Sequence, residues 1–160
     1  MSAHCDHILF DWGDTVMKDD PTRTDAMYLW PQVELVEGAA EVLRVLASSH
    51  QLGIATSAVG SDATKVRKAL ARVGVDRYIK VVFTAFTTGF AKTDARFWQC
   101  VLLELDAPAE RVLMVGDGFE GDVLVPSGLG LQAVWFNPRT AETRCGKNYR
   151  TIHCLTELIA

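Results

Sequence analysis

Three aspartates follow apolar runs, at positions where their carboxylates could bind a metal ion or act as a nucleophile. Asp11 directly follows the apolar run His7–Phe10, and Asp117 and Asp122 follow the apolar run Val112–Val115. Carboxylate oxygens, with no sulfur or imidazole group beside them, suit Mg²⁺ better than zinc. A carboxylate can also attack the phosphorus of a phosphate ester when a divalent cation reduces the repulsion between the two anions. These residues predict a magnesium site that could support phosphoryl chemistry.

Two hydroxyl residues and a lysine could bind the phosphate group itself. Thr56 and Ser57 follow the run Leu52–Ala55, where hydroxyls and free backbone N–H groups ahead of a helix could hold an anion. Lys92 lies between two expected elements and could neutralise phosphoryl oxygens. Taken singly, Asp11 is more often a turn residue, Thr56 a helix cap and Lys92 a solvated surface lysine. Their significance depends on whether the fold brings them together.

Short apolar runs alternate with amphipathic stretches along the chain. The runs predict buried parallel strands and the stretches have helical spacing. This alternation predicts a single doubly wound, Rossmann-like α/β domain over residues 1–160 with a mainly parallel sheet. Ligands bind at the carboxyl ends of such strands, so the polar residues above should meet at one edge. The expected strands are His7–Phe10, Leu52–Ala55, Val81–Phe83, Val112–Val115 and Ala133–Phe136, and the expected helices are 39–48, 61–73, 93–105 and 119–129.

Local signals set some of the helix ends. Ser61 or Asp62 is a suitable N-cap for the helix over 61–73, and Gly74 should end it. Pro126 lies inside the stretch 119–129 and should shorten or bend that helix, because proline has no backbone N–H.

In this order, each near a strand end, the polar residues closely resemble the four motifs of the haloacid dehalogenase (HAD) superfamily. The resemblance runs from about residue 7 to about residue 137. In the third motif, Thr93-Asp94-Ala95 replaces the usual Pro-x-Pro tail after the lysine. The matching residues are Asp11 and Thr15 for the first motif, Thr56 for the second, Lys92 for the third, and Asp117 with Asp122 for the fourth.

The resemblance implies Mg²⁺-dependent hydrolysis of phosphate monoesters. Asp11 would attack phosphorus to give an aspartyl-phosphate, which water would then hydrolyse. Asp11, Asp117 and the backbone carbonyl of Gly13 would bind Mg²⁺, and Asp122 would bind it directly or through water. The implied enzyme is loosely like the core of a phosphoglycolate-type phosphatase.

The resemblance also implies the contacts to substrate. Lys92 and Thr56 would act beside Asp11 by neutralising the nucleophile and holding the phosphoryl oxygens. The implied substrate would be a phosphorylated small molecule or a bulky phosphoester. The implied substrate-binding residues are Trp12, Gly13, Thr56, Ser57 and Lys92.

One position departs from the family pattern. Hydrolases of this family usually carry a second aspartate two residues after the nucleophile, where it protonates the leaving group, and here that position is Gly13. General acid–base help is typically worth about 10²–10⁴-fold in rate. Asp14 either replaces this acid or fixes the turn after Trp12 by local hydrogen bonds, and the turn is the favoured interpretation.

The chain is too short between its motifs for a separate cap domain. Residues 16–55 and 57–91 each hold little more than a helix and a strand, whereas a domain of even about 50 residues would need far more room. The segment 18–37 has no clear period and is expected to be a packed loop or a small flap, with exposed apolar side chains at Met27, Tyr28, Leu29 and Trp30. Association into a homodimer through this segment is a further hypothesis.

Composition excludes several function classes. The net charge of −4 gives no electrostatic reason to expect nucleic-acid binding. No apolar run approaches the roughly 18 residues of a membrane span, and the N-terminus does not suit a signal peptide. The four cysteines lie far apart, so we expect reduced thiols in a cytoplasmic protein.

Alternative interpretations start from the same residues. Gly13 and the missing cap also fit a catalytically weak or inactive protein that binds a partner. Gly116, Gly118 and Gly121 spell a dinucleotide-binding fingerprint, but Asp117 would place a carboxylate beside the pyrophosphate. A phosphorelay receiver would gather its metal-binding acids after the first strand, whereas here the paired acids come late. Dehalogenation of a small acid would not need the Mg²⁺ ligands.

Overall fold

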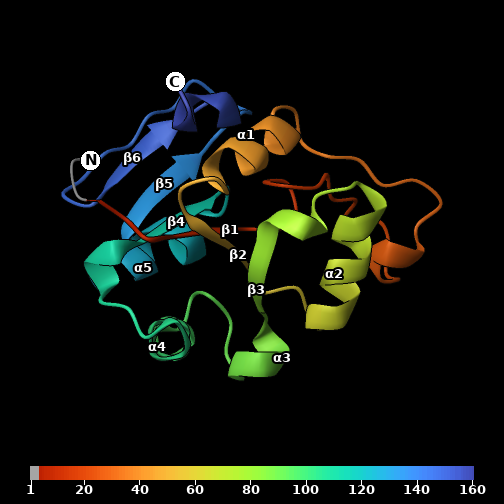
Figure 1. Ribbon diagram of the computed structural model, residues 1–160, viewed down its shortest axis with the longest axis horizontal. Helices are drawn as coiled ribbons and strands as arrows, with labels where there is room; N and C mark the ends of the chain where they lie inside the picture. The colour runs from red at the N-terminus through yellow and green to blue at the C-terminus, as the bar shows by residue number, and fades with distance from the viewer. Residues whose placement is uncertain (1–3) are drawn as a thin grey trace.

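Six parallel strands form one sheet in the computed structural model, which describes residues 4–160 (Figure 1). Their order across the sheet is β3-β2-β1-β4-β5-β6, and every neighbouring pair is parallel. All five predicted strands are present, and the predicted α/β fold with a parallel sheet is confirmed. The strands are β1 (His7–Phe10), β2 (Gln51–Ala55), β3 (Ile79–Phe83), β4 (Val112–Gly116), β5 (Gln132–Phe136) and β6 (Tyr149–Ile152).

Within residues 4–160, five α-helices and several shorter helical turns connect the strands. The start of α2 agrees with its sequence signal, because the Asp62 side chain accepts a hydrogen bond from the Lys65 backbone N–H at 2.9 Å. Gly74 follows this helix with a φ of +77°, a conformation that glycine adopts without strain. The α-helices are α1 (Ala39–Leu46), α2 (Ala63–Arg72), α3 (Ala85–Thr88), α4 (Ala95–Leu105) and α5 (Val125–Gly128), and the 3₁₀ turns are Met27–Leu29, Asp76–Tyr78, Ala109–Arg111 and Leu155–Leu158.

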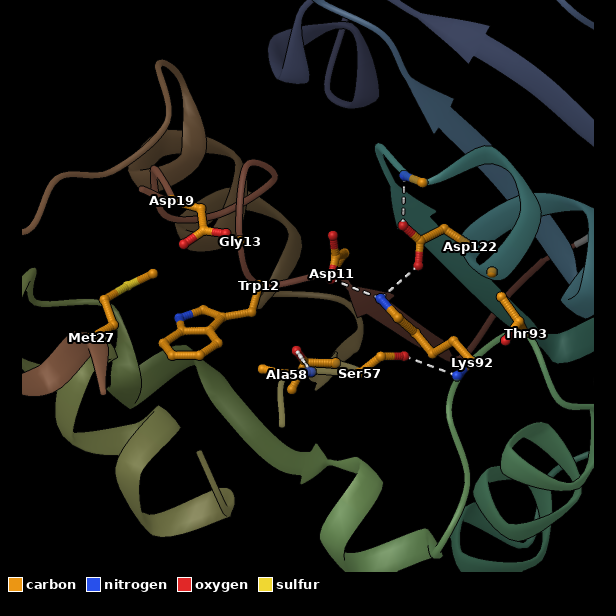
Figure 2. Close-up of a pocket in the computed structure, with 13 residues that line it drawn as sticks. Asp11, Trp12, Gly13, Asp19, Met27, Ser57, Ala58, Lys92, Thr93 and Asp122 are labelled. Carbon is orange, nitrogen blue, oxygen red and sulfur yellow. Dashed lines mark hydrogen bonds and ion pairs between the residues drawn. The ribbon is translucent and has the colours of Figure 1, made fainter. Parts of the chain in front are cut away.

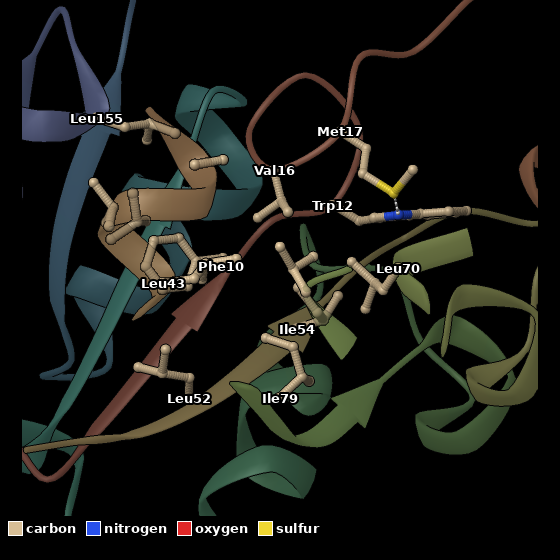
Figure 3. Close-up of a cluster of buried hydrophobic side chains, with 14 of the residues drawn as sticks. Phe10, Trp12, Val16, Met17, Leu43, Leu52, Ile54, Leu70, Ile79 and Leu155 are labelled. Carbon is tan, nitrogen blue, oxygen red and sulfur yellow. Dashed lines mark hydrogen bonds between the residues drawn. The ribbon is translucent and has the colours of Figure 1, made fainter. Parts of the chain in front are cut away.

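The helices cover both faces of the sheet, and each face has its own apolar core. Along β1, Phe10 packs in a cluster with Leu43 of α1 and Leu70 of α2 (Figure 3). Leu9 points the other way and packs with Trp98 of α4. Burying a large apolar side chain contributes about 1.5–3 kcal/mol, so the two layers hold the loops at the strand ends in fixed positions.

Most of the stretch 119–129 is helical as predicted, but it is not one regular α-helix. The chain forms a π-helical segment at Phe119–Leu124 and then the short α5. Pro126 lies in the first turn of α5, where its missing N–H group leaves no hydrogen bond broken. The π-helical segment buries Asp122, whose backbone N–H donates to the Gly118 carbonyl at 2.8 Å.

The segment 18–37 packs against the body of the protein. The Lys18 N–H donates to the Glu34 carbonyl at 2.9 Å, and Arg72 of α2 donates to the Trp30 carbonyl at 2.6 Å. The expected exposure of Met27 and Trp30 is wrong, because both side chains are buried in the larger core, while Leu29 is 59% exposed. Association through this segment stays a prediction, although Trp30 offers little surface for it.

Two expectations from the composition concern the cysteines and membrane-spanning helices. The four cysteines all lie within the described residues and all are free thiols. Across residues 4–160, no helix combines the length and apolarity that crossing a bilayer requires.

Candidate active site

The polar residues singled out from the sequence meet at the carboxyl edge of the sheet. Asp11 continues β1, where its backbone N–H donates to the Val115 carbonyl at 2.9 Å. Thr56 continues β2 in the same way, donating to the Phe83 carbonyl at 3.0 Å. These strand-like bonds carry the sheet one residue further and fix where both side chains start. The site lies beside β1 and β4, where the strand order changes direction and open α/β sheets commonly bind ligands.

Lys92 lies at the centre of the site. Its Nζ atom is 2.7 Å from Asp11 Oδ1, 2.7 Å from Asp122 Oδ1 and 3.0 Å from the Ala55 carbonyl oxygen (Figure 2). Only 8% of the Lys92 side chain is exposed. Burial alone would lower the pKa of this amine, but the two carboxylates outweigh burial and raise it above its ordinary value. Lys92 is therefore a fixed positive charge beside Asp11.

Neighbouring residues hold the Lys92 backbone in place. Its N–H donates to the Ser57 hydroxyl at 2.9 Å, and its carbonyl accepts the Trp98 indole N–H at 2.9 Å. Ser57, predicted to contact substrate, thus also joins the loop after β2 to the loop that carries Lys92. The Thr56 hydroxyl accepts the Ala58 backbone N–H at 3.1 Å, which leaves its own proton free to donate to a phosphate oxygen.

Asp117 and Asp122 complete an acidic cluster around Asp11. One carboxylate oxygen from each of the three residues lies within 4.8 Å of the other two. Burial is the main cause that raises the pKa of both Asp117 and Asp122, and Asp11 raises both further, through a hydrogen bond and its charge at Asp117 and through its charge at Asp122. The Thr15 hydroxyl lies 3.5 Å from Asp11 Oδ2 and 3.3 Å from Asp117 Oδ1, so it can donate to either carboxylate. Three carboxylates facing one lysine leave an excess of negative charge.

This cluster fits a hard divalent cation. Asp122 Oδ1 is buried and accepts no well-aligned hydrogen bond from residues 4–160, although it forms the ion pair with Lys92. A bound Mg²⁺ would give this carboxylate oxygen a partner. It would also favour the ionised carboxylates, whose pKa values are raised without a cation, and it prefers an all-oxygen ligand set. Asp11, Asp117 and Asp122 are suitable ligands. Gly13, whose backbone carbonyl was predicted as a further ligand, lines the same pocket as Asp11.

Two glycines make room for the charged side chains. A Cβ atom on Gly116 would overlap the Asp122 carboxylate, and a Cβ on Gly121 would lie 3.3 Å from the Cβ of Lys92. The Gly118 backbone N–H donates to Asp122 Oδ2 at 2.9 Å. The glycines that spell a dinucleotide fingerprint therefore pack around this site's own carboxylate and lysine, and this leaves the fingerprint without independent support.

A cavity of about 380 Å³ opens above Asp11. Asp11, Gly13, Thr56, Ser57 and Lys92 line it together, and so does Trp12. The Trp12 side chain is only 4% exposed, and its indole N–H points to the Met17 sulfur at 3.2 Å, so it offers a ring face rather than a hydrogen-bond donor. Met27 adds a second apolar group to this wall (Figure 2).

Asp14 has a structural role in the turn after Trp12. Its backbone adopts the left-handed conformation, with a φ of 60°. One carboxylate oxygen accepts the Asp19 backbone N–H at 3.0 Å, and the other lies 3.2 Å from Arg139. These contacts agree with the favoured interpretation that Asp14 fixes the turn by local hydrogen bonds.

Sequence reasoning missed two residues at the site. Arg139 lies 3.2 Å from Asp14 and 3.4 Å from Asp117, so it joins the loops after β1 and β4. Asp19 lines the cavity beside Gly13. Arg139 could have been found by the strand-end rule, because it closely follows the predicted strand Ala133–Phe136. Asp19 gave no such signal, because it lies in the segment without a period.

Curated relatives of known activity match a large part of the chain. A ribulose-1,5-bisphosphate 5-phosphatase from Halopiger xanaduensis is 31% identical over 67% of this chain and 44% of its own length. The pyrimidine 5'-nucleotidase YjjG from Escherichia coli is 31% identical over 88% of this chain and 63% of its own length. The chain thus spans less than two thirds of the length of either relative.

Solved structures share the fold over nearly the whole chain. An uncharacterised protein from Listeria monocytogenes superposes with a TM-score of 0.81 at 22% identity, covering 95% of this chain and 93% of its own. The putative HAD-hydrolase YfnB from Bacillus subtilis, a structure bound to magnesium, superposes with a TM-score of 0.77 at 19% identity, covering 97% of both chains. At these identities the likeness concerns the fold alone.

The family model of the haloacid dehalogenase-like hydrolases matches residues 13–128. This range includes Thr56, Lys92, Asp117 and Asp122 and begins just after Asp11. Together with the parallel sheet and the polar residues at its carboxyl edge, the match accounts for most of the chain. The protein belongs to the haloacid dehalogenase-like hydrolase family.

Proposed function

We propose that this chain is a phosphatase that hydrolyses phosphate monoesters with the help of Mg²⁺ and uses Asp11 as its nucleophile. The observation that carries the proposal is the contact of Asp11 with Lys92 at 2.7 Å inside an open cavity. Asp117 and Asp122 stand beside this pair as further metal ligands. The curated relatives that support the proposal include phosphatases and nucleotidases named for phosphorylated small molecules.

The residues divide the reaction between attack and charge stabilisation. An Asp11 oxygen would attack phosphorus, giving an aspartyl-phosphate and releasing the alcohol, and water would then free inorganic phosphate and restore Asp11. Lys92 would stabilise the charge on the transferring phosphoryl oxygens, since its own charge is held by the buried contacts described above. The Thr56 hydroxyl would donate to one of these oxygens, because its acceptor side is already used by Ala58.

A cation would be needed because the site is otherwise too negative for a phosphate. Asp11, Asp117 and Asp122 are the side chains that would hold Mg²⁺, together with the Gly13 carbonyl. When bound, Mg²⁺ would reduce the repulsion between Asp11 and the incoming phosphate group. Arg139 would remain at the rim, where it already contacts Asp117 at 3.4 Å.

Release of p-nitrophenol from p-nitrophenyl phosphate tests this proposal. We expect Mg²⁺-dependent release that falls to about one thousandth or less in Asp11→Asn, because a missing nucleophile is not replaced by its neighbours. Asp106→Asn is the matched control: Asp106 ends α4 in a left-handed conformation that asparagine also accepts, and it lies outside the cavity. A folded parent chain without activity would instead favour a binding protein that keeps the fold.

A further inference from the structure

Asp19 lies on the boundary between two cavities. The first, of about 380 Å³, holds Asp11, Thr56 and Lys92, and is the cavity proposed for the phosphate group. The second, of about 430 Å³, extends along the segment 18–37 past Trp30 and Val59. Trp12, Asp19, Met27 and Ala58 line both cavities. If phosphate occupies the first cavity, a larger substrate has room to extend into the second along this shared wall, which would place the bond to be broken near Asp19.

Among the titratable side chains that line the phosphate cavity, Asp19 is the one without a role so far. The four such side chains are Asp11, Asp19, Lys92 and Asp122. Asp11 and Asp122 are both in ion pairs with Lys92, at 2.7 Å each. Asp14, the nearest alternative acid, has one oxygen bound to a backbone N–H and the other beside Arg139. Asp19 is therefore the carboxylate that is free to exchange a proton with substrate.

The surrounding chain orients Asp19 toward the cavity. Its backbone N–H donates to Asp14 Oδ1 at 3.0 Å, and its Oδ1 accepts the Asp20 backbone N–H at 2.8 Å. Its Oδ2 lies 3.5 Å from the place that a Cβ atom on Gly13 would take. Because Gly13 has no side chain, the space next to Oδ2 is open to a leaving group. Figure 2 shows the Asp19 carboxylate beside Gly13, on the side of Trp12 and Met27 and away from Asp122.

We infer that Asp19 is the general acid and base of this site, an inference that rests on the proposed phosphatase function. As the bond between phosphorus and the leaving oxygen breaks, the protonated Asp19 gives its proton to that oxygen and the alcohol leaves. Asp19, now a carboxylate, then takes a proton from the water that attacks the phosphorus of aspartyl-phosphate. The bond to Asp11 breaks, its electron pair returns to the Asp11 carboxylate, and inorganic phosphate is formed.

Two substrates of nearly the same shape isolate this role. p-Nitrophenolate is a weak base and leaves readily without a proton, whereas p-methoxyphenolate is a much stronger base whose departure is helped by a proton. We expect Asp19→Asn to lower kcat/KM for p-methoxyphenyl phosphate by about 10²-fold or more, and for p-nitrophenyl phosphate by less than about 10-fold. Asp20→Asn is the matched control. It removes a charge next to Asp19 but keeps the exposed position and the backbone N–H that donates to Asp19 Oδ1, so it should change neither rate much.

A second measurement moves the carboxylate from position 19 to position 13. Asp19→Gly should show the same selective loss, and the double variant Gly13→Asp/Asp19→Gly should recover most of it, because the side chain at 13 would project toward the space that Asp19 leaves. Equal effects on both substrates, or no effect, in a folded Asp19→Asn would overturn the inference while leaving the phosphatase proposal intact. A parent chain that releases no p-nitrophenol would overturn both.

Discussion

The site combines two groups of charges that differ in their access to water. The inner group is Asp11, Lys92 and Asp122, whose side chains are 13%, 8% and 2% exposed. The outer group is Asp14, Asp19 and Arg139, and the Asp14 and Arg139 side chains are 37% and 60% exposed. The inner contacts are 2.7 Å long, while Arg139 stays 3.2 Å from Asp14 and 3.4 Å from Asp117.

The difference in exposure indicates which charges the fold depends on. Opposite charges removed from water interact strongly, and losing one partner leaves the other buried without compensation. Exposed pairs are screened by water and salt and typically contribute about 0–1 kcal/mol. Changes in the inner group should therefore alter both stability and activity, while changes in the outer group should have little effect on stability.

Removing the inner lysine should have the largest effect. We expect Lys92→Met to lower the free energy of unfolding by about 3–5 kcal/mol without Mg²⁺, because Asp11 and Asp122 lose their shared partner. Urea unfolding followed by circular dichroism measures this change. Lys147→Met, at an exposed position between β5 and β6, is the control and should change the free energy of unfolding little. A loss in Lys92→Met below about 1 kcal/mol would remove the distinction between the two groups.

The carboxylates of the acidic cluster around Asp11 should make Mg²⁺ binding depend on pH. Burial and then the neighbouring Asp11 carboxylate raise the pKa values of Asp117 and Asp122 above those of an unfolded chain, where aspartate titrates near 4. The metal-free protein should therefore lose stability as pH rises from about 4 through the folded-state values, because folding favours the protonated carboxyls. Mg²⁺ needs the ionised forms, so its stabilising effect should increase over the same range.

Thermal unfolding with and without Mg²⁺ at pH 5 and pH 8 measures this dependence. We expect the midpoint shift caused by Mg²⁺ to be larger at pH 8 by several degrees, since about 1 kcal/mol moves the midpoint of a chain of this size by about 2–4 °C. Asp117→Asn should reduce the shift at both pH values. A shift that is equal at both, or larger at pH 5, would contradict the ligand assignment.

The sequence predicts most of the inner group because two of its members obey a general rule. Asp11 and Lys92 lie near the ends of strands with clear apolar runs, and parallel strands bring such positions together. Asp122 was predicted as a metal ligand from its place after the run Val112–Val115, but its burial was not, since the π-helical segment that buries it is not visible in the residue spacing. β6 was hidden for a different reason: of Tyr149–Ile152, only Ile152 is buried, so this edge strand has no apolar run.

The sequence does not predict the outer group as a whole, because its residues lie on irregular loops. Asp19 reaches the cavity through the path of the segment 18–37, which is set by long-range contacts such as the bridge between Met17 and Leu35. Arg139 depends on how the connection between β5 and β6 folds back over Asp117. Loop paths of this kind follow from the packing of the whole chain rather than from local propensity.

Removing the outer arginine should have the smallest effect. We expect Arg139→Gln to change the free energy of unfolding by less than about 1 kcal/mol at low salt and by nearly nothing at 1 M salt, because its side chain is 60% exposed. Urea unfolding at the two salt concentrations provides the measurement. Arg96→Gln, which breaks the exposed pair with Asp94, should behave alike. A loss above about 2 kcal/mol that persists in salt would place Arg139 with the inner group.

Three of the four tryptophans contact the loops that build the site. Trp12 lies in the cavity wall, the Trp98 indole donates to the Lys92 carbonyl at 2.9 Å, and the Trp135 indole donates to the Asp117 carbonyl at 3.0 Å. Indole emission responds to the polarity and charge around the ring. The protein therefore carries built-in optical reporters on both sides of Asp11, so that occupancy of its site can be followed by ultraviolet fluorescence in the unlabelled chain.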